Sequence, residues 1–338
     1  MSERARVAVV GAGSWGTALA GVLAGNGHRT VLWALEPEVA AEVNASHTNA
    51  AYLPGATLPE SLTATSRLAE ALADAEVVVS VAPSQFVASV MAEAAPHLAD
   101  DALVVSASKG IEINTLRRMD QVMDEVLTPA QRARFSVLSG PSFAAEVAEG
   151  APTAVVAASG DADAARRVQR LFQNRQFRVY TNPDVIGVEL GGALKNVVAL
   201  GAGVAAGLGF GHNTRAALIT RGLAEITRLG VAMGARRETF SGLAGMGDLV
   251  LTCTGDLSRN RTVGFRLGQG ESLDEILGEM RAVAEGVKTA EAVAALAARH
   301  EVEMPIAAEV HAILTQGRSP REALDNLMSR DPKPEEWS

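Results

Sequence analysis

Short β-branched runs alternate with longer helical stretches through the first 180 residues, and this alternation constrains the fold more than any other feature. Strands are expected at 7–10, 30–33, 77–81, 103–106, 135–138, 153–156 and 177–180. The runs are almost continuously apolar, which is typical of parallel strands covered by helices on both faces of a sheet. The sequence therefore predicts an α/β domain over residues 1–182, with a doubly wound, largely parallel sheet.

The strand-like runs nearly vanish after Thr181-Asn182-Pro183. Asn182 is a good helix cap and Pro183 suits a first helical position. Helical periodicity follows at 214–230, 272–280, 285–299 and 305–315. Because 338 residues exceed what one hydrophobic core usually holds, we predict a second, all-helical domain at 183–330. Residues 331–338 are expected to form a poorly ordered tail.

A glycine-rich loop follows the first strand and opens the first expected helix. Gly11, Gly13 and Gly16 have the spacing G-x-G-x-x-G, around Ser14 and Trp15. The first glycine permits a tight turn, the second lets a pyrophosphate approach the backbone, and the third lets the helix pack closely on the strand. Glu36, about 20 residues farther on, stands where such Rossmann-type folds place a carboxylate for the adenosine ribose. The loop predicts dinucleotide binding; a turn needed only for packing is the alternative.

Two further loops follow expected strands and are candidates for the same edge of the sheet. Lys109 lies in the loop after the 103–106 strand, and Gly140 and Ser142 lie in the loop after 135–138. Ligands of doubly wound sheets bind at the carboxyl ends of the strands. We therefore expect Lys109 to face the cofactor crevice, although an ordinary surface lysine would fit the same sequence.

Lysine is scarce, which draws attention to Lys195. Of the 30 basic residues only Lys109, Lys195, Lys288 and Lys333 are lysines. A desolvated lysine can release a proton, whereas arginine does not. Lys195 lies in an apolar, glycine-bearing stretch, 188–200, which suits an acid/base catalyst. The alternative is a lysine whose stem is packed and whose head reaches water.

The helical half contains one compact basic cluster. Ser258, Arg259, Asn260 and Arg261 are consecutive. Guanidinium, amide and hydroxyl donors together suit a phosphate group, although basic surface loops are common. Asp248 is either a helix cap or, if the fold brings the two together, a partner that orients and balances Lys195.

Composition excludes several classes of function. The net charge of −9 argues against nucleic acid or an anionic membrane as the main partner. The one cysteine, Cys253, rules out an internal disulfide, and the six histidines lack metal-ligand spacing, so no metal is expected. No secretory signal is seen, and no run reaches the ~18 apolar residues of a membrane span, the richest candidate being 197–211. A cytoplasmic location is expected.

Eight segments of the chain, in order, resemble the soluble bacterial NAD(P)-dependent glycerol-3-phosphate dehydrogenases. The resemblance covers residues 5 to about 330, and its segments are Gly11–Ala20, Tyr52–Gly55, Ser106–Glu112, Ser139–Glu146, Glu189–Asn196, Gly242–Thr252, Ser258–Arg261 and Val283–Gly286. It implies reversible hydride transfer between a nicotinamide cofactor, NAD or NADP, and glycerol 3-phosphate or dihydroxyacetone phosphate, with an active site between the two domains. It also implies a homodimer that supplies glycerol 3-phosphate for phospholipid synthesis.

The resemblance assigns roles to individual residues. It makes Lys195 the catalytic acid/base. The residues that it implies around the substrate are Lys109, Gly140, Ser142, Lys195, Asp248, Ser258, Arg259 and Asn260. Those that it implies around the cofactor, beside Gly11, Gly13, Gly16 and Glu36 of the glycine-loop argument, are Ser14, Trp15, Tyr52, Lys109, Ala144, Arg259, Val283 and Glu285.

The segment that ends the second strand departs from many bacterial members. Those carry an arginine there that could meet a 2′-phosphate, whereas this chain has Leu35 and Glu36. We therefore expect NADH to be used at least as well as NADPH. Two other functions stay open: a different hydroxy-acid dehydrogenase with the same two domains, and a dinucleotide sensor without turnover. A sensor needs no acid/base, so the joint retention of four residues argues against it: Lys195, Asn196, Asp248 and Arg259.

Overall fold

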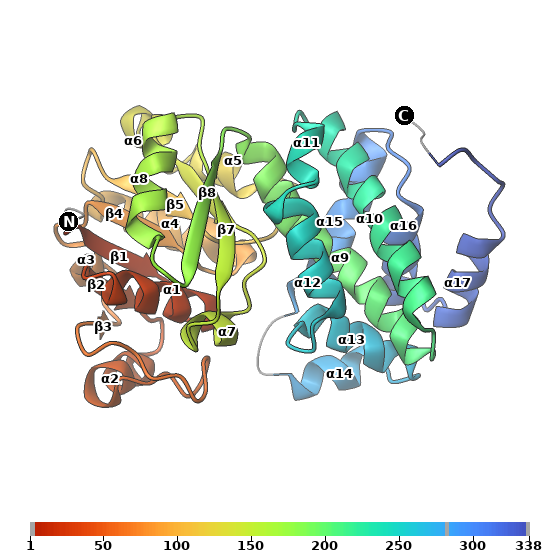
Figure 1. The fold of residues 1–338 in the computed structure, drawn as a ribbon, viewed down its shortest axis with the longest axis horizontal. Coiled ribbons are helices and arrows are strands. Elements are labelled where there is room, and N and C mark those ends of the chain that lie inside the picture. The colour runs from red at the N-terminus through yellow and green to blue at the C-terminus, as the bar shows by residue number, and fades with distance from the viewer. Residues whose placement is uncertain (1–3, 281–283, 336–338) are drawn as a thin grey trace. The chain divides into compact units, whose positions relative to one another are not determined.

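The computed structural model describes residues 4–280 and 284–335 and divides the chain into two compact units (Figure 1). The first unit comprises Met1–Lys109 and Arg117–Glu189, and the second comprises Gly110–Leu116 and Leu190–Ser338. The chain therefore passes from one unit to the other three times, once through a short excursion at 110–116.

The first unit is built on one eight-stranded sheet in the order β3-β2-β1-β4-β5-β6-β7-β8. Its strands are β1 (Arg6–Val10), β2 (Arg29–Trp33), β3 (Thr63–Thr65), β4 (Val77–Ser80), β5 (Leu103–Ser106), β6 (Ser136–Ser139), β7 (Thr153–Ala158) and β8 (Phe177–Asn182). Every neighbouring pair is parallel except β6 and β7. The order 3-2-1-4-5-6 is that of the doubly wound dinucleotide-binding fold, so the predicted fold class is confirmed.

Helices cover this sheet and bury both faces of its central strands. They are α1 (Ser14–Gly25), α2 (Pro37–Ser46), α3 (Leu68–Leu72), α4 (Val87–Ala94), α5 (Met119–Met123), α6 (Pro129–Ala133), α7 (Ala144–Ala148) and α8 (Ala162–Phe172), with short 3-10 turns η1 (Ser84–Phe86) and η2 (Ala95–His97). In β1, Val7 and Val9 on one face and Ala8 and Val10 on the other are all buried. This two-sided burial explains why the strands read as continuous apolar runs.

The regular secondary structure of the second unit, in its described residues, is entirely helical. Its helices are α9 (Val185–Gly207), which begins at the end of the first unit, α10 (His212–Ala232), α11 (Arg237–Phe240), the π-helix η3 (Leu243–Gly247), α12 (Asp248–Thr254), α13 (Arg259–Gly268), α14 (Leu273–Glu279), α15 (Glu285–Arg299), α16 (Pro305–Thr315) and α17 (Pro320–Met328). The periodicity at 285–299 and 305–315 matches α15 and α16 residue for residue.

Glycines let the neighbouring helices approach α9, the central helix of this unit (Figure 1). A Cβ added at Gly203 would lie 2.1 Å from the carbonyl oxygen of Arg261 in α13. A Cβ added at Gly191 would lie 2.4 Å from the carbonyl oxygen of Ala244 in η3. At both positions only hydrogen fits, so the backbones of these elements are in direct contact.

Two expectations differ from the structure. The short β3 was missed, because Thr63-Ala64-Thr65 is too brief to produce a pattern. The strand β8 extends through Asn182, and α9 begins at Val185, where Asp184 Oδ1 accepts the Gly187 N–H at 2.9 Å. Asn182 and Pro183 therefore do not start the helix; Asn182 instead accepts the Asp184 N–H. In the expected tail, Lys333 Nζ lies 2.8 Å from Glu303 Oε2, and poor order of the tail stays a prediction.

The helix α9 is continuous for 23 residues, although its sequence suggested a run broken by glycines. By length and composition it alone, among the described helices, could span a membrane. However, 89% of its most apolar window is buried inside the protein. It is therefore the core helix of the second unit.

Candidate functional site

The glycine loop lies directly after β1, where the sheet order changes direction between β1 and β4. Gly11 has φ +123°, and a Cβ there would lie 3.0 Å from the Val81 backbone that follows β4. A Cβ on Gly16 would lie 1.8 Å from the Gly11 carbonyl oxygen, so the third glycine is required for packing. Gly13 has open space where its side chain would be. The loop thus presents an uncovered backbone before α1.

This arrangement fits the pyrophosphate of a dinucleotide. The first helix begins at Ser14 with no side-chain cap at Gly13. The first amides of a helix have no carbonyl partner within it, and together with the helix dipole they favour an anion. The open position at Gly13 leaves room for one to approach. The geometry agrees with the turn and packing roles of Gly11 and Gly16, and the approach of a pyrophosphate at Gly13 stays a prediction.

Other predicted cofactor residues surround the same loop. Ser14 Oγ donates to the Tyr52 carbonyl oxygen at 2.5 Å, and Tyr52 Oη donates to Glu36 Oε1 at 2.8 Å. Trp15 and Ala144 are partly buried against the core, and the indole N–H of Trp15 is buried with no hydrogen-bond partner in the described structure. The predicted Ser14, Tyr52 and Glu36 are thus linked in a chain of hydrogen bonds.

Sequence reasoning missed Asn49, which organises this region. Asn49 is only 1% exposed, and its Nδ2 donates to the Ala12 carbonyl oxygen and to Thr17 Oγ1 at 2.9 and 2.8 Å. Its Oδ1 accepts the Tyr52 N–H at 3.2 Å. A buried asparagine in a segment rich in Thr, Asn and Ala gave no sequence signal, because its partners are brought to it only by the fold.

The two strand-end loops are joined by hydrogen bonds. Lys109 Nζ donates to the Gly140 carbonyl oxygen at 3.0 Å, and Ser142 Oγ donates to the same oxygen at 2.9 Å. Gly140 has φ +140°, and a Cβ there would lie 3.0 Å from the Val155 backbone, so glycine is required. Lys109, Gly140 and Ser142 therefore form one polar cluster in the first unit.

In the second unit the fold brings Lys195 and Asp248 together. Lys195 Nζ lies 2.5 Å from Asp248 Oδ1 and 2.9 Å from Thr252 Oγ1. Lys195 is 7% exposed and Asp248 1%. A buried charge needs an opposite partner and hydrogen bonds, and this ammonium has both. The structure therefore does not show the alternative, which was a lysine whose ammonium group lies in bulk water.

Thr252 completes this group, and sequence reasoning gave it no role. It lies one turn after Asp248 in α12, and its hydroxyl donates to the Asp248 carbonyl oxygen at 2.6 Å. That bond turns the lone pairs of Oγ1 toward the ammonium. The i, i+4 spacing from Asp248 was the signal that could have found it.

The neighbouring Cys253 is chemically quiet. It is buried, and desolvation raises the pKa of its thiol to about 12, although Lys195 acts in the opposite direction. A thiol of this kind is almost entirely protonated near neutral pH and is a poor nucleophile. Cys253 is therefore not a candidate nucleophile.

The two arginines of the basic cluster at 258–261 have different surroundings. Ser258 caps α13 by accepting the Arg261 N–H at 3.2 Å, and Arg261 Nη1 is paired with Asp256 at 2.9 Å. Arg259 is exposed, and in the described ranges no carboxylate lies within ion-pair distance of it. Arg259, at the first position of α13, is thus the arginine of the pair that can take an anion.

Asn260 is fixed by the start of α15. Its Oδ1 accepts the Gly286 N–H at 2.9 Å, and a Cβ on Gly286 would clash with this oxygen and with the Asn196 carbonyl oxygen. The contact ties α13 and α15 to α9 one residue after Lys195. Glu285 is the first residue of α15, whereas Val283 lies outside the described residues.

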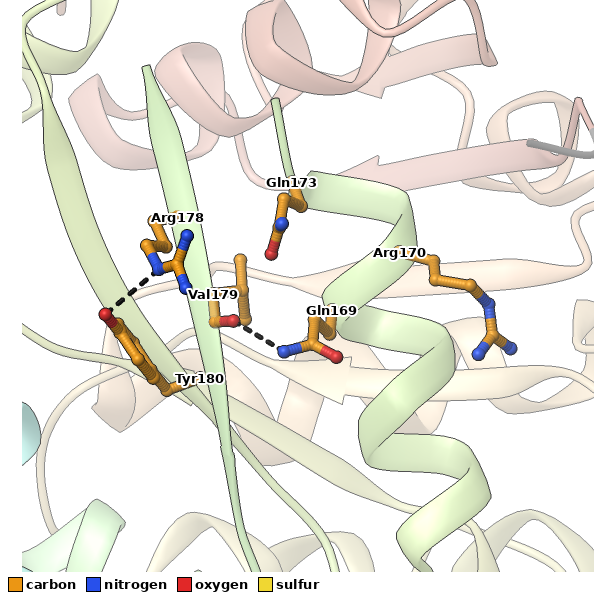
Figure 2. A pocket seen from close by; sticks show the side chains of 6 residues that line it. All are labelled: Gln169, Arg170, Gln173, Arg178, Val179 and Tyr180. Carbon is orange, nitrogen blue, oxygen red and sulfur yellow. Dashed lines mark hydrogen bonds between the residues drawn. The ribbon is translucent and has the colours of Figure 1, made fainter. Parts of the chain in front are cut away.

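A surface hollow of about 370 Å³ lies elsewhere, between α8 and β8 (Figure 2). It is lined by Gln169, Arg170, Gln173, Arg178, Val179 and Tyr180. Arg178 donates to the Tyr180 hydroxyl, and in Figure 2 Arg170 extends away from these two residues. No predicted site residue lines this hollow, so it is separate from both clusters.

Comparison with known proteins gives a consistent result. Residues 6–165 match the model of the NAD-dependent glycerol-3-phosphate dehydrogenase N-terminus, and residues 184–325 match that of the C-terminus. The chain is 61% identical to a glycerol-3-phosphate dehydrogenase [NAD(P)+] of Geobacter metallireducens, over 98% of each chain.

Solved structures agree. The glycerol-3-phosphate dehydrogenase of Coxiella burnetii superposes with a TM-score of 0.92 at 39% identity, over 97% of this chain and 99% of that one. The yeast enzyme from Saccharomyces cerevisiae gives 0.81 at 28% identity, over 96% and 99%. With both family models matched in order, and with the glycine loop and the Lys195 group in place, the chain belongs to the NAD-dependent glycerol-3-phosphate dehydrogenase family.

Proposed function

We propose that this protein is an NAD(P)-dependent glycerol-3-phosphate dehydrogenase that interconverts dihydroxyacetone phosphate and glycerol 3-phosphate. The observation that carries the proposal is the buried group of Lys195, Asp248 and Thr252 in a chain that also has an open glycine loop at the β1 edge. The first can move a proton and the second can hold a dinucleotide. Reduction of a ketone requires both.

Lys195 is the proposed proton donor when the ketone is reduced. An ammonium has three N–H bonds, and Asp248 and Thr252 accept two of them. These two bonds hold the ammonium in one position before the substrate arrives. As negative charge builds on the carbonyl oxygen, Lys195 stabilises it and transfers a proton to it. In the oxidative direction the neutral amine takes the proton back from the hydroxyl.

Asp248 sets the charge of the site. It keeps the buried group electrically balanced while Lys195 is protonated, and it lies too deep to contact bulk water. Thr252 holds the ammonium from the other side without adding charge. We therefore assign Asp248 and Thr252 as groups that position Lys195.

The substrate phosphate is proposed to bind at the start of α13. Arg259 is exposed there, and the donor end of the Asn260 amide is available because its oxygen is occupied by Gly286. A guanidinium and an amide can together satisfy several phosphate oxygens. Binding the phosphate, away from the reacting carbon, orients the ketone. Ser258 has a structural part as the cap of this helix, and Lys109, Gly140 and Ser142 remain predicted substrate contacts in the first unit.

The cofactor is NADH or NADPH, which when bound supplies the hydride for the ketone carbon. The residues proposed to hold it are the backbone of Gly11, Gly13 and Gly16 and the side chains of Ser14, Trp15, Glu36 and Tyr52, with Lys109 and Ala144 of the first unit and Arg259 and Glu285 of the second. Its pyrophosphate fits the amides that open α1. The remaining proposals are a homodimer, a cytoplasmic location and the supply of glycerol 3-phosphate for phospholipid synthesis.

A direct assay tests the proposal. Purified protein is mixed with dihydroxyacetone phosphate and NADH or NADPH, and nicotinamide absorbance is followed over time. Consumption of the reduced cofactor that depends on the phosphorylated ketone, and is lost in Lys195→Met, supports the function. Turnover of a non-phosphorylated hydroxy or keto acid instead would favour the other class of two-domain dehydrogenase. Tight cofactor binding without any turnover would favour a sensor.

A further inference from the structure

The carboxylate at the end of β2 is held by a tyrosine from another segment. Glu36 precedes α2, but its side chain does not cap that helix. It accepts instead a hydrogen bond from Tyr52 Oη at 2.8 Å. The same bond, with the negative charge of Glu36, raises the pKa of the Tyr52 phenol, so its proton stays on oxygen. Glu36 Oε1 is thereby given a fixed position.

Tyr52 is itself anchored to the glycine loop. Ser14 Oγ donates to its carbonyl oxygen, and the buried Asn49 accepts its N–H. Asn49 also donates to the Ala12 carbonyl oxygen and to Thr17. The hydroxyl of Tyr52, and through it the carboxylate of Glu36, is therefore held in register with the loop proposed to bind the pyrophosphate.

This arrangement distinguishes two kinds of ribose by hydrogen-bond chemistry. The Tyr52 hydroxyl donates its one hydrogen bond to Glu36, so it has no proton left to donate to a phosphate oxygen. A carboxylate with one oxygen already hydrogen-bonded can accept a hydrogen bond from a hydroxyl group on its other oxygen. A ribose 2′-hydroxyl can donate this hydrogen bond, whereas a 2′-phosphate contributes only hydrogen-bond acceptors and negative charge. Leu35 beside it is 72% exposed and brings no charge.

Two arginines stand near β2, one on the strand itself and one after its neighbour β3. Arg29 is the first residue of β2, and Glu36 follows the last residue of this strand, so the two lie at opposite ends of it. Arg67 follows β3, whose Thr65 pairs with Trp33, so Arg67 lies about level with Leu35. Its guanidinium, however, is paired with Glu70.

We propose that Tyr52 is a specificity-determining residue: by holding the Glu36 carboxylate it favours an adenosine ribose with a free 2′-hydroxyl over one with a 2′-phosphate. This inference rests on the proposed nicotinamide-cofactor function. It gives Tyr52 an effect on cofactor choice that operates through Glu36, in addition to any contact of its own with the cofactor.

The test measures binding without turnover, using ADP-ribose and 2′-phospho-ADP-ribose in calorimetric titrations. The wild type is expected to bind ADP-ribose more tightly. Tyr52→Phe should lower affinity for ADP-ribose by about fivefold, the scale of one charge-assisted hydrogen bond partly replaced by water, and change that for 2′-phospho-ADP-ribose by less than about twofold. Glu36→Gln keeps an acceptor for Tyr52 and removes the charge, so it should raise affinity for the 2′-phosphate compound by about fivefold.

A double-mutant cycle identifies the route of the effect. In a Glu36→Ala background, Tyr52→Phe should leave the ratio of the two affinities unchanged within about twofold, because the carboxylate through which it acts is gone. Tyr180→Phe is the matched control, since Tyr180 is the other tyrosine of the chain, on β8 at the far edge of the sheet, and its hydroxyl is bonded only to Arg178 in the described structure (Figure 2). It should leave both affinities as they are.

Kinetics give an independent readout. With saturating NADH, kcat of Tyr52→Phe should stay within about twofold of wild type while KM for NADH rises, because positioning of the ribose affects binding more than chemistry. A wild type that prefers 2′-phospho-ADP-ribose, or a Tyr52→Phe effect equal on both probes or equal in both backgrounds, overturns the inference alone. If neither probe binds the wild type, the proposed function is overturned together with the inference.

Discussion

Lys195 Nζ and Asp248 Oδ1 lie 2.5 Å apart although 53 residues separate them in the sequence. The first is on the long central helix α9 and the second opens α12, immediately after a π-helix. Gly191, one turn before Lys195, lets α9 contact the backbone of that π-helix. The contact between Lys195 and Asp248 therefore depends on a glycine as well as on the two charges.

Replacement of Lys195 tests its role as proton donor. Lys195→Met keeps the apolar stem and should reduce kcat by at least ~10²-fold, the usual scale for loss of a general acid. Lys195→Arg should fail too, because arginine keeps its proton. Steady-state rates with dihydroxyacetone phosphate are the measurement, and a near-normal rate in either variant contradicts the assignment.

The buried Asp248 provides the control for that experiment. Lys195→Met leaves Asp248 buried without its partner, which should lower the free energy of unfolding by about 3–5 kcal/mol. The double variant Lys195→Met/Asp248→Asn removes the uncompensated charge and should recover most of this stability. It should remain inactive. Recovery of activity along with stability would mean that Lys195 serves the fold rather than the chemistry.

Arg259 is expected to bind the substrate phosphate. Arg259→Ala should raise KM for dihydroxyacetone phosphate by about tenfold or more, since a charged hydrogen-bonding partner is lost. The change should be much smaller for unphosphorylated dihydroxyacetone. Arg266→Ala is the matched control, because this arginine of the same helix is paired with Glu271 and Glu279. Equal losses of Arg259→Ala on both substrates would show that Arg259 does not bind the phosphate.

Substitutions at the end of β2 should change the preference between NADH and NADPH. We expect kcat/KM of the wild type to be at least as high with NADH as with NADPH. Leu35→Arg/Glu36→Ser supplies a positive charge, removes a negative one and should shift the ratio toward NADPH by about tenfold. Dihydroxyacetone phosphate is held fixed in both assays. A strong preference of the wild type for NADPH, or no shift in the double variant, would refute the placement of the ribose at Glu36.

Glu225 makes stability depend on pH. It is buried in α10, accepts the N–H groups of Ile306 and Ala307 at the start of α16, and desolvation raises its pKa from 4.5 to about 7. The folded protein thus binds this proton more tightly than the unfolded chain. The resulting stability is fully present below pH ~4.5 and is lost as pH rises through about 7, a change of order 3 kcal/mol.

Urea unfolding at a series of pH values from 5 to 8, compared between wild type and Glu225→Gln, measures this contribution. The variant keeps an acceptor for Ile306 but cannot ionise, so its curve should lack the decline through this window. Other carboxylates titrate equally in both proteins and cancel in the difference. Parallel curves for the two proteins would contradict a raised pKa at Glu225.

Close packing of α9 on α13 should be sensitive to a single methyl group. In Gly203→Ala the new Cβ would lie 2.1 Å from the Arg261 carbonyl oxygen, and the forced shift should cost about 1–3 kcal/mol of stability or more. It should also raise KM for dihydroxyacetone phosphate, because α13 begins at Arg259. Gly278→Ala in α14, where nothing lies within 4 Å, should instead leave stability unchanged or raise it by up to about 1 kcal/mol. Thermal unfolding of the two variants provides the comparison.

The sequence by itself determined the local elements and the chemistry they can carry. Continuous apolar runs indicated buried parallel strands, and the glycine spacing marked the loop after β1, because both depend on neighbours within a few residues. The scarcity of lysine singled out Lys195, and the resemblance supplied most of the other site residues. Short or ambiguous local patterns were insufficient. The three residues of β3 produced no pattern, and Asn182-Pro183 predicted a helix start although Asp184 is the cap.

Only the tertiary structure decided which of these groups meet. Asp248 as a cap and Asp248 as a partner of Lys195 are equally compatible with the sequence, because their contact depends on helix packing at Gly191 and not on local pattern. The same holds for Thr252, for Asn49 beneath the glycine loop and for the bond from Tyr52 to Glu36. The two arginines of the 258–261 cluster are alike in sequence, and they separate only when Asp256 pairs with Arg261 and leaves Arg259 exposed. Each of these outcomes depends on long-range proximity and burial, which one-dimensional periodicity does not encode.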